Sequence, residues 1–269
     1  MFNKRHIVRT IAATVSILAL SFTAACGSGQ STASNSTDSD DITQQTYKPG
    51  KLTIATGQPA YEPWVMNDKP ESGEGYEAAV AYAVADKLGF KKSDVVWTRT
   101  AFDTAIAPGA KDWDFNIQQF GITDERKKAV DFSSSYYNDS QSVVVKKDSK
   151  FANATKVSDL KDATVGVMVG TLAYDYAKAN IKDDIQTFND DAALAQALDA
   201  GQIDVLVTST VECVYMVQSE QVKDAKVLGR LPDSEDKSGM GIVLPKDSKL
   251  TAAVTKAVDD LNADGTIKQ

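Results

Sequence analysis

Short apolar runs rich in β-branched residues alternate with helical patterns along residues 51–269, and this alternation constrains the fold more than any other feature. The runs lie at 51–56, 94–98, 115–120, 142–146, 163–169, 203–208 and 240–245. Several of them are continuously apolar, which is typical of strands covered on both faces. Because strands and helices alternate, the sequence predicts an α/β fold with mainly parallel sheets.

Three helical patterns separate the apolar runs. They cover residues 76–88, 191–200 and 250–261, and each stops before a glycine, Gly89, Gly201 or Gly265. The 3.6-residue period predicts the buried face of the first pattern as Tyr76, Ala79, Val80, Ala83, Val84 and Leu88. It predicts the buried stripe of the last as Leu250, Val254, Val258 and Leu261.

The first 25 residues have the features of an export signal. Lys4, Arg5 and Arg9 precede an apolar run at 11–20 and small residues up to Ala25. That run is shorter than the ~20 residues of a permanent membrane-spanning helix. We therefore expect residues 1–25 to be a signal peptide that is removed on export.

The sequence Phe22–Gly27 resembles a lipoprotein processing site, where cleavage before Cys26 frees it for attachment of lipid, including palmitate. Thr23 departs from that pattern, which has an aliphatic residue three places before the cysteine. The alternative is an ordinary secretory cleavage beside an incidental cysteine. We expect a lipoprotein anchored to the outer face of the cytoplasmic membrane, or a periplasmic protein. The polar residues 26–49 cannot bury enough apolar area to fold, so they are predicted to form a flexible Ser/Thr-rich tether.

Charge and composition exclude several classes of function. Loss of the three basic signal residues takes the formal charge from −8 to −11, and an acidic domain is a poor binder of nucleic acid. His6 is the only histidine and is lost with the signal, and Cys213 is the only cysteine left if Cys26 carries lipid. Catalytic triads and Cys/His metal sites are thereby removed. We expect a monomer without enzymatic activity, cofactor or metal, in which Cys213 is a core residue.

Two similar β-branched runs divide the folded part. Residues 142–148 and 241–247 each lead into Lys-Asp-Ser and bracket a self-contained set of strands and helices. One interpretation is that both runs cross between two lobes, and the alternative is that both are ordinary edge strands. The first predicts lobe 1 from 50–144 and 241–269, and lobe 2 from 145–240.

Arg126 is the strongest candidate for a binding residue. The run at 115–120 leads into a predicted helix with Thr123 as N-cap and Asp124 and Glu125 in its first turn. Arg126 would then lie beside unpaired N–H groups, where its guanidinium could hold a carboxylate by two hydrogen bonds. The alternative is an exposed arginine paired with a nearby acid.

Other candidates have weaker signals. The loop aromatics Tyr61, Trp64 and Phe102 would form either a wall for a ligand or packing between loop and core. Gly170-Thr171 begins a helix at 172–179, which Thr171 would cap, although many helices begin this way without binding anything. Residues 73–78 fit a loose G-x-G-x-x-A pattern, but no strand precedes them, so a nucleotide site is rejected.

From Lys51 onward the chain resembles the extracellular solute-binding proteins of polar amino acid ABC importers, a family 3 type of periplasmic binding protein. The most specific match is Ile122-Thr123-Asp124-Glu125-Arg126 followed by Val130-Asp131-Phe132-Ser133. The other matching pieces, in family order, lie at 60–64, 75–77, 158–161, 165–167, 170–171 and 263–266.

The resemblance implies a two-lobed type II periplasmic-binding-protein fold with two hinge strands. It also implies a small polar ligand, an amino acid or related solute, delivered to a membrane permease. Arg126 would grip the ligand carboxylate, helped by the main chain around Gly121 and Thr171. The remaining residues implied to flank the ligand or shape its pocket are Gln58, Tyr61, Trp64, Phe102, Gln118 and Gln119.

One departure from the family concerns the ligand's ammonium group. The family has an aspartate just after a strand of the second lobe, where this chain has Ser209. Either Glu212 supplies the missing charge or the ligand lacks a standard α-amino group, because an unpaired buried ammonium is costly.

Two rival functions remain open. Some dehydratases share this fold, and a carboxyl group such as that of Glu212 would then carry acid–base chemistry. The third hypothesis is a sensor subunit that passes its closed state to a membrane receptor.

Overall fold

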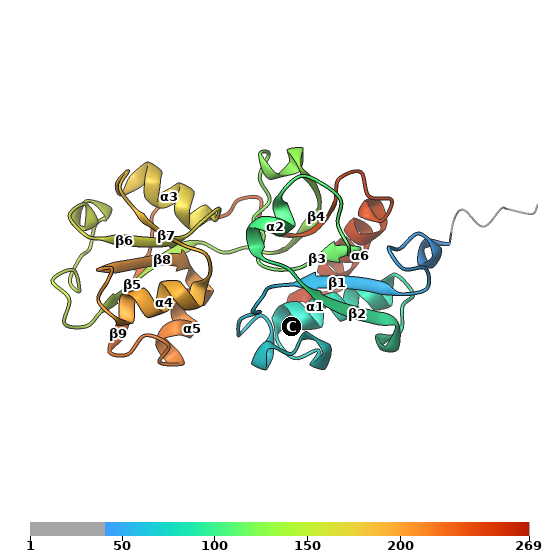
Figure 1. Cartoon of the computed structure of the whole chain (residues 1–269), viewed down its shortest axis with the longest axis horizontal. Coiled ribbons are helices and arrows are strands. Elements are labelled where there is room, and N and C mark those ends of the chain that lie inside the picture. The colour runs from blue at the N-terminus through green and yellow to red at the C-terminus, as the bar shows by residue number, and fades with distance from the viewer. Residues whose placement is uncertain (1–40, 269) are drawn as a thin grey trace, which may run out of the picture. The chain divides into compact units, whose positions relative to one another are not determined.

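The computed structural model describes residues 41–268, whose strands form two five-stranded sheets in two lobes (Figure 1). The first lobe contains the sheet with the spatial order β2-β1-β3-β10-β4. Its strands are β1 (Leu52–Thr56), β2 (Val95–Arg99), β3 (Phe115–Asn116), β4 (Val130–Tyr137) and β10 (Met240–Pro245). The second lobe contains the sheet with the order β7-β6-β8-β5-β9. Its strands are β5 (Gln141–Lys146), β6 (Val165–Met168), β7 (Gln186–Phe188), β8 (Val205–Ser209) and β9 (Ala225–Arg230).

Each sheet is mixed, with three neighbouring strands parallel and the remaining pairings antiparallel. In the first sheet β2, β1 and β3 are parallel, and β10 is antiparallel to both β3 and β4. In the second, β7, β6 and β8 are parallel, and β5 is antiparallel to both β8 and β9. The predicted α/β two-lobed fold is confirmed, but its sheets are not mainly parallel, because the chain enters and leaves the second lobe through the antiparallel strands.

Helices cover both faces of each sheet. Those of the first lobe are α1 (Tyr76–Lys87), α2 (Phe102–Ile106) and α6 (Thr251–Ala263), and those of the second are α3 (Leu172–Asn180), α4 (Asp191–Asp199) and α5 (Thr210–Gln218). α1 and α6 bury their apolar faces in one core of the first lobe, whereas α2 belongs to a separate cluster. In the second lobe α3 packs in one cluster and α4 and α5 in another. Cys213 of α5 is completely buried, as predicted for a core residue.

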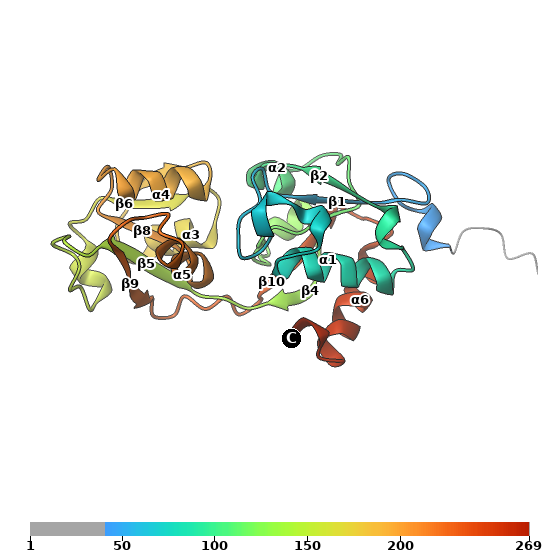
Figure 2. The ribbon, with the colours of Figure 1, turned by 90° about the horizontal axis from the view of Figure 1, so that it is seen from below.

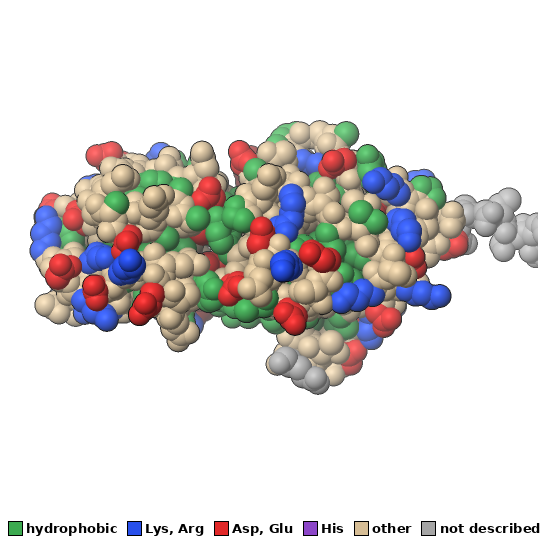
Figure 3. Space-filling view, turned by 60° about the horizontal axis from the view of Figure 1, so that its bottom comes forward, with side chains coloured by type: hydrophobic (Ala, Val, Ile, Leu, Met, Phe, Trp, Pro, Cys, Tyr) green, Lys and Arg blue, Asp and Glu red, His purple; other side chains and the backbone are tan. Residues whose placement is uncertain are grey.

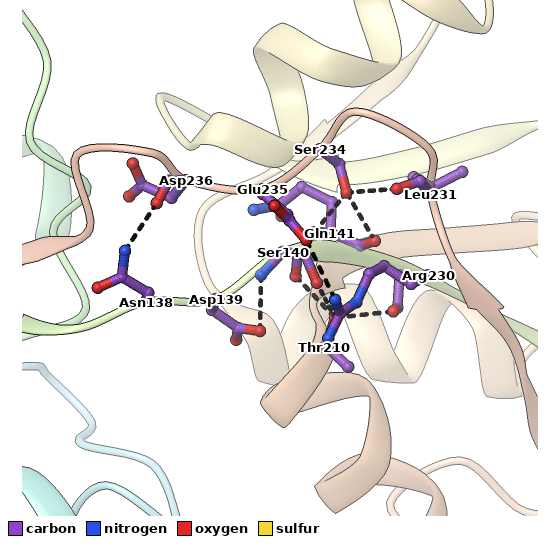
Figure 4. Close-up of polar contacts among 11 residues, drawn as sticks. Asn138, Asp139, Ser140, Gln141, Thr210, Arg230, Leu231, Ser234, Glu235 and Asp236 are labelled. Carbon is purple, nitrogen blue, oxygen red and sulfur yellow. Dashed lines mark hydrogen bonds and ion pairs between the residues drawn. The ribbon is translucent and has the colours of Figure 1, made fainter. Parts of the chain in front are cut away.

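Two short segments cross between the lobes and lie beside each other (Figure 2). One joins β4 to β5 through residues 138–140, and the other joins β9 to β10 through residues 231–239. The N–H of Asp236 donates to the carbonyl of Asp139 at 2.9 Å, and the side-chain amide of Asn138 donates to the carbonyl of Asp236 at 3.2 Å (Figure 4).

The sequence placed these crossings too far along the chain. Residues 142–146 lie within β5 and pair in the second sheet, and residues 241–245 lie within β10 in the first. Residues 141–144 therefore belong to the second lobe, although the sequence assigned all four of them to the first. The β-branched runs are the buried strands themselves, because a crossing segment needs no such apolar pattern.

Residues 41–49 pack on the first lobe, although the sequence assigned them to the flexible tether. Ile42 contacts the apolar core, and the N–H of Tyr47 donates to the Asp114 carboxylate at 2.5 Å. Cys26 and the predicted signal peptide and tether up to residue 40 lie outside the described residues. Within residues 41–268, none of the helices has both the length and the apolar composition to cross a membrane.

Candidate functional site

A cavity of about 200 Å³ lies between the two lobes and is lined by residues of both. A cavity of this size has room for a small metabolite. Ten of the thirteen residues predicted to bind ligand line it: Gln58, Tyr61, Phe102, Gln118, Gln119, Gly121, Arg126, Thr171, Ser209 and Glu212. The other three, Trp64, Thr123 and Gly170, support residues of the lining.

Among residues 41–268, Arg126 is the only cationic residue of the lining. Its guanidinium donates to the carbonyl of Gly121 at 2.6 Å and, across the lobes, to the carbonyl of Gly170 at 2.7 Å. It also lies 5.5 Å from the centre of the Phe102 ring. Burial lowers the pKa of Arg126, and within residues 41–268 it forms no ion pair. The alternative of an arginine paired with a surface acid is thus not what the structure contains.

The local backbone around Arg126 differs from the prediction. β3 ends at Asn116 instead of continuing to residue 120, and the predicted helix is only a 3-10 turn at Arg126–Lys128. Arg126 begins that turn, and its N–H donates to the Thr123 hydroxyl at 3.1 Å. A helix N-terminus therefore does not assist Arg126 from the first lobe.

Glu77, which the sequence did not identify as a site residue, holds Gln119 in place beside the cavity. Its carboxylate is completely buried and accepts the main-chain N–H of Gln119 at 2.7 Å, together with the Gln119 amide and the Tyr136 hydroxyl. Gln119 has a left-handed backbone, with φ of 50°. Burial raises the pKa of Glu77 to about 7. Gln119 lines the cavity, but its side-chain amide is hydrogen-bonded to Glu77.

Trp64 lies behind the cavity wall and connects the lobes. It is 1% exposed, and its indole N–H donates to Glu212 Oε1 at 2.5 Å. Gly75 allows this placement, because a Cβ on Gly75 would lie 2.5 Å from the Trp64 carbonyl oxygen. Trp64 is therefore a packing residue that also orients a cavity carboxyl group.

Two further hydrogen bonds join the lobes. The Tyr61 hydroxyl in the cavity accepts the N–H of Ala192 at 3.3 Å. Outside the cavity, the Tyr215 hydroxyl donates to the Glu62 carboxylate. The lobes are thus in a closed arrangement in which residues of each touch the other.

The N-terminus of α3 meets the cavity from the second lobe, as predicted. The Thr171 hydroxyl accepts the N–H of Tyr174 at 3.2 Å and caps the helix. Leu172 and Ala173 of the first turn line the cavity. Helical first-turn N–H groups have no partner within the helix and favour anions, so this end and Arg126 are two groups of the cavity lining with the chemistry to attract an anion.

Within the described residues, five carboxyl groups and one guanidinium line the cavity. The sequence had identified Glu212 and missed the other four, Asp139, Asp190, Asp191 and Asp236. Asp190 and Asp191 start α4, so their only sequence signal was that of an ordinary helix start. Asp139 and Asp236 lie in the crossing segments, whose position the sequence had misplaced. On the molecular surface shown in Figure 3, by contrast, basic and acidic side chains are interspersed.

Ser209 is used as a cap. Its hydroxyl accepts the N–H of Glu212 at 3.2 Å and begins α5. Glu212 is 4% exposed, and burial raises its pKa well above the usual range, with the charge of Asp191 adding to the rise. The second lobe therefore carries its acidic groups beside the strand end and not at Ser209 itself.

Comparison with known proteins gives one consistent family. Residues 52–269 match the model of the bacterial extracellular solute-binding proteins, family 3. The L-arginine-binding protein of Pseudomonas aeruginosa is 29% identical over 82% of this chain and 86% of its own length. The L-cystine-binding protein TcyA of Bacillus subtilis is 28% identical over 95% of this chain and 91% of its own. A solved structure of an ancestral arginine-binding protein bound to arginine superposes with a TM-score of 0.69 at 30% identity, over 81% of this chain and 95% of that one.

Proposed function

Because the chain belongs to the bacterial extracellular solute-binding proteins of family 3, we propose that it is the substrate-binding lipoprotein of an ABC importer. It captures a small polar amino acid or a related carboxylate-bearing solute by closure of its two lobes. The observation that carries this proposal is a cavity of about 200 Å³ that both lobes line and that contains the guanidinium of Arg126, which forms no ion pair within the described residues.

The ligand acts as the bridge between the lobes. Its carboxylate binds Arg126 of the first lobe and the N-terminus of α3 in the second, while Tyr61 and Phe102 flank it. A ligand that contacts both lobes favours the closed state over the open one, and the permease recognises the closed state.

Calorimetric titration of the mature protein with each of the twenty amino acids tests this function. We expect saturable binding of at least one of them. A folded sample that binds none would remove the amino acid proposal, and turnover of the titrated compound would favour the dehydratase-like rival instead. The relatives named above are binding proteins, which favours capture without turnover.

Lipid attachment is a separate part of the proposal and has its own test. Cells grown with labelled palmitate should label the wild type and a Cys213→Ser variant, since Cys213 is buried, but not a Cys26→Ser variant. Label retained in Cys26→Ser would contradict the anchor while leaving the binding function intact.

A further inference from the structure

Asp191 is a buried carboxyl group with one oxygen that has no hydrogen-bond partner within the described residues. It is the first residue of α4 and is 9% exposed. Within the described residues its Oδ1 atom has no hydrogen-bond partner. The carboxyl group has a side-chain hydrogen bond with Thr208. Buried polar groups are nearly always hydrogen-bonded, so an orphaned oxygen in a cavity wall indicates a missing partner.

Glu212 lies in the same wall with a similar deficit of positive charge. It accepts one N–H, from Trp64, and within residues 41–268 no lysine or arginine forms an ion pair with it or with Asp191. The two carboxyl groups are close enough that the charge of Asp191 affects the pKa of Glu212. Two buried like charges without a cation destabilise each other.

The other three carboxyl groups of the cavity already have main-chain partners. Asp139 accepts the N–H groups of Ser140 and Val211, and Figure 4 shows the first of these contacts. Asp190 caps α4 by accepting the N–H of Ala193 at 2.8 Å. Asp236 accepts the N–H groups of Ser238 and Gly239 through Oδ1. Its Oδ2 has no hydrogen-bond partner within the described residues, but Asp236 has a cation nearby, because the charge of Arg126 opposes the rise in its pKa that burial causes. The unmet demand for a cation is therefore concentrated at Asp191 and Glu212.

We propose that Asp191 and Glu212 together form the cation subsite of the cavity and bind a cationic nitrogen group of the ligand, whose carboxylate is bound by Arg126. This inference rests on the proposed function. It assigns the positive end of the ligand to α4 and the start of α5, with Ser209 serving only as the cap that sets the position of Glu212. The ligand class is amino acids, since these carry a carboxylate and a cationic group together.

The test compares Asp191→Asn and Glu212→Gln with Asp184→Asn. The control makes the same kind of change at an exposed residue of the second lobe that does not line the cavity. The probes are L-arginine, L-glutamine and 5-guanidinopentanoate, which is arginine without its α-ammonium group. We expect each test variant to bind its best amino acid more than about 100-fold more weakly, and the control to change by less than about fivefold.

The three probes show which cationic group the pair binds. If it is the α-ammonium group, 5-guanidinopentanoate binds the wild type weakly and loses little more in the test variants. If it is the side-chain group, L-glutamine instead binds the wild type weakly and loses little more affinity in the test variants. Amino acid affinities of wild type and test variants that agree within threefold would overturn the subsite, whereas a wild type that binds no amino acid would instead refute the proposed function.

Two readouts separate a binding role from a structural one. Without ligand at pH 7.5, Asp191→Asn should unfold at a higher temperature than the wild type, because it removes a buried charge that no cation pairs. With ligand, the wild type should release protons at pH 6, measured in buffers of different ionisation enthalpy. The charged and polar groups facing the pair are Asp190 on α4, Glu77 on α1, Asp139 in the crossing and Trp64 before α1. A lower unfolding temperature together with unchanged proton release in the variants would contradict the subsite.

Discussion

The two lobes line one cavity with opposite chemistry. The first lobe contributes one guanidinium, aromatic rings and glutamine amides, whereas the second lobe and the crossing segments contribute five carboxyl groups. Neither wall is electrostatically satisfied alone, because Arg126 forms no ion pair within the described residues and Asp191 has an orphaned oxygen. A ligand with one negative and one positive group would pair both walls only when the lobes are closed. In the proposed mechanism of capture, this difference between the walls couples ligand binding to closure.

The largest expected effect comes from removing the only cation of the first wall. Arg126→Ala should weaken binding of the amino acid ligand by about 1000-fold, since breaking a buried charge pair costs ~3–5 kcal/mol. Arg126→Lys should recover only part of this, because lysine cannot form two parallel hydrogen bonds to a carboxylate. Calorimetry measures both, with exposed Lys127→Ala as the control. Equal affinities for Arg126→Ala and the wild type would contradict the proposed role of the first wall in pairing the negative group of the ligand.

The second effect is a pH dependence of the unliganded protein. Burial raises the pKa of Glu77 from 4.5 to about 7 and that of Asp191 from 3.8 to about 6. Between about pH 4 and 7 the folded state thus holds more protons than the unfolded state, so the free energy of unfolding falls as pH rises. Because a tenfold change in proton affinity corresponds to ~1.4 kcal/mol, the total fall is a few kcal/mol.

Urea unfolding at pH 5 and pH 7.5 checks this dependence. The wild type should be more stable at pH 5, and Glu77→Gln and Asp191→Asn should each reduce the difference. Asp264, whose pKa the Thr266 contacts and Lys87 lower to about 2, titrates below this window and does not compensate. Equal stability at both pH values would show that neither wall holds a buried proton.

A smaller effect is expected where the walls approach each other most closely. A Cβ on Gly121 would lie 2.6 Å from Leu172 Cδ1 of α3, so Gly121→Ala should hinder closure. Because the leucine end can shift, we expect about tenfold weaker binding. Adding Leu172→Ala should restore most of the lost affinity. Unchanged affinity in Gly121→Ala would mean that Gly121 and Leu172 lie farther apart in the closed protein than 2.6 Å from the added Cβ implies.

The smallest expected effect lies outside the cavity. Tyr215→Phe removes the partly buried hydrogen bond to Glu62 that joins the lobes, and a typical hydrogen bond contributes ~0.5–1.5 kcal/mol. Ligand affinity should fall by about threefold. A loss above about 30-fold would mean that this outer contact, and not the charged cavity, controls closure.

Much of the fold was predictable because buried elements carry strong periodic signals. The strands at 52–56 and 240–245 and the stripe of α6, from Val254 to Leu261, are buried as expected. The face of α1 was partly wrong, since Ala79 is exposed and Glu77 is buried. Periodicity cannot predict a buried glutamate whose partner, Tyr136, lies in β4.

The site was predictable only in part, for a different reason. Arg126 and the residues near it follow a recognisable run of sequence, whereas Asp190 and Asp191 have the same signal as any capped helix. Asp139 and Asp236 enter the cavity because the crossing segments pass beside it, which depends on the packing of both lobes. The sequence therefore identified most of the first wall and little of the charge on the second.

The most direct test of capture by closure is small-angle X-ray scattering of the mature protein with and without its best amino acid ligand. We expect the radius of gyration to decrease on saturation in the wild type and to stay constant in Arg126→Ala at the same ligand concentration. Saturable binding by the wild type without any decrease would contradict closure of the two lobes around the ligand.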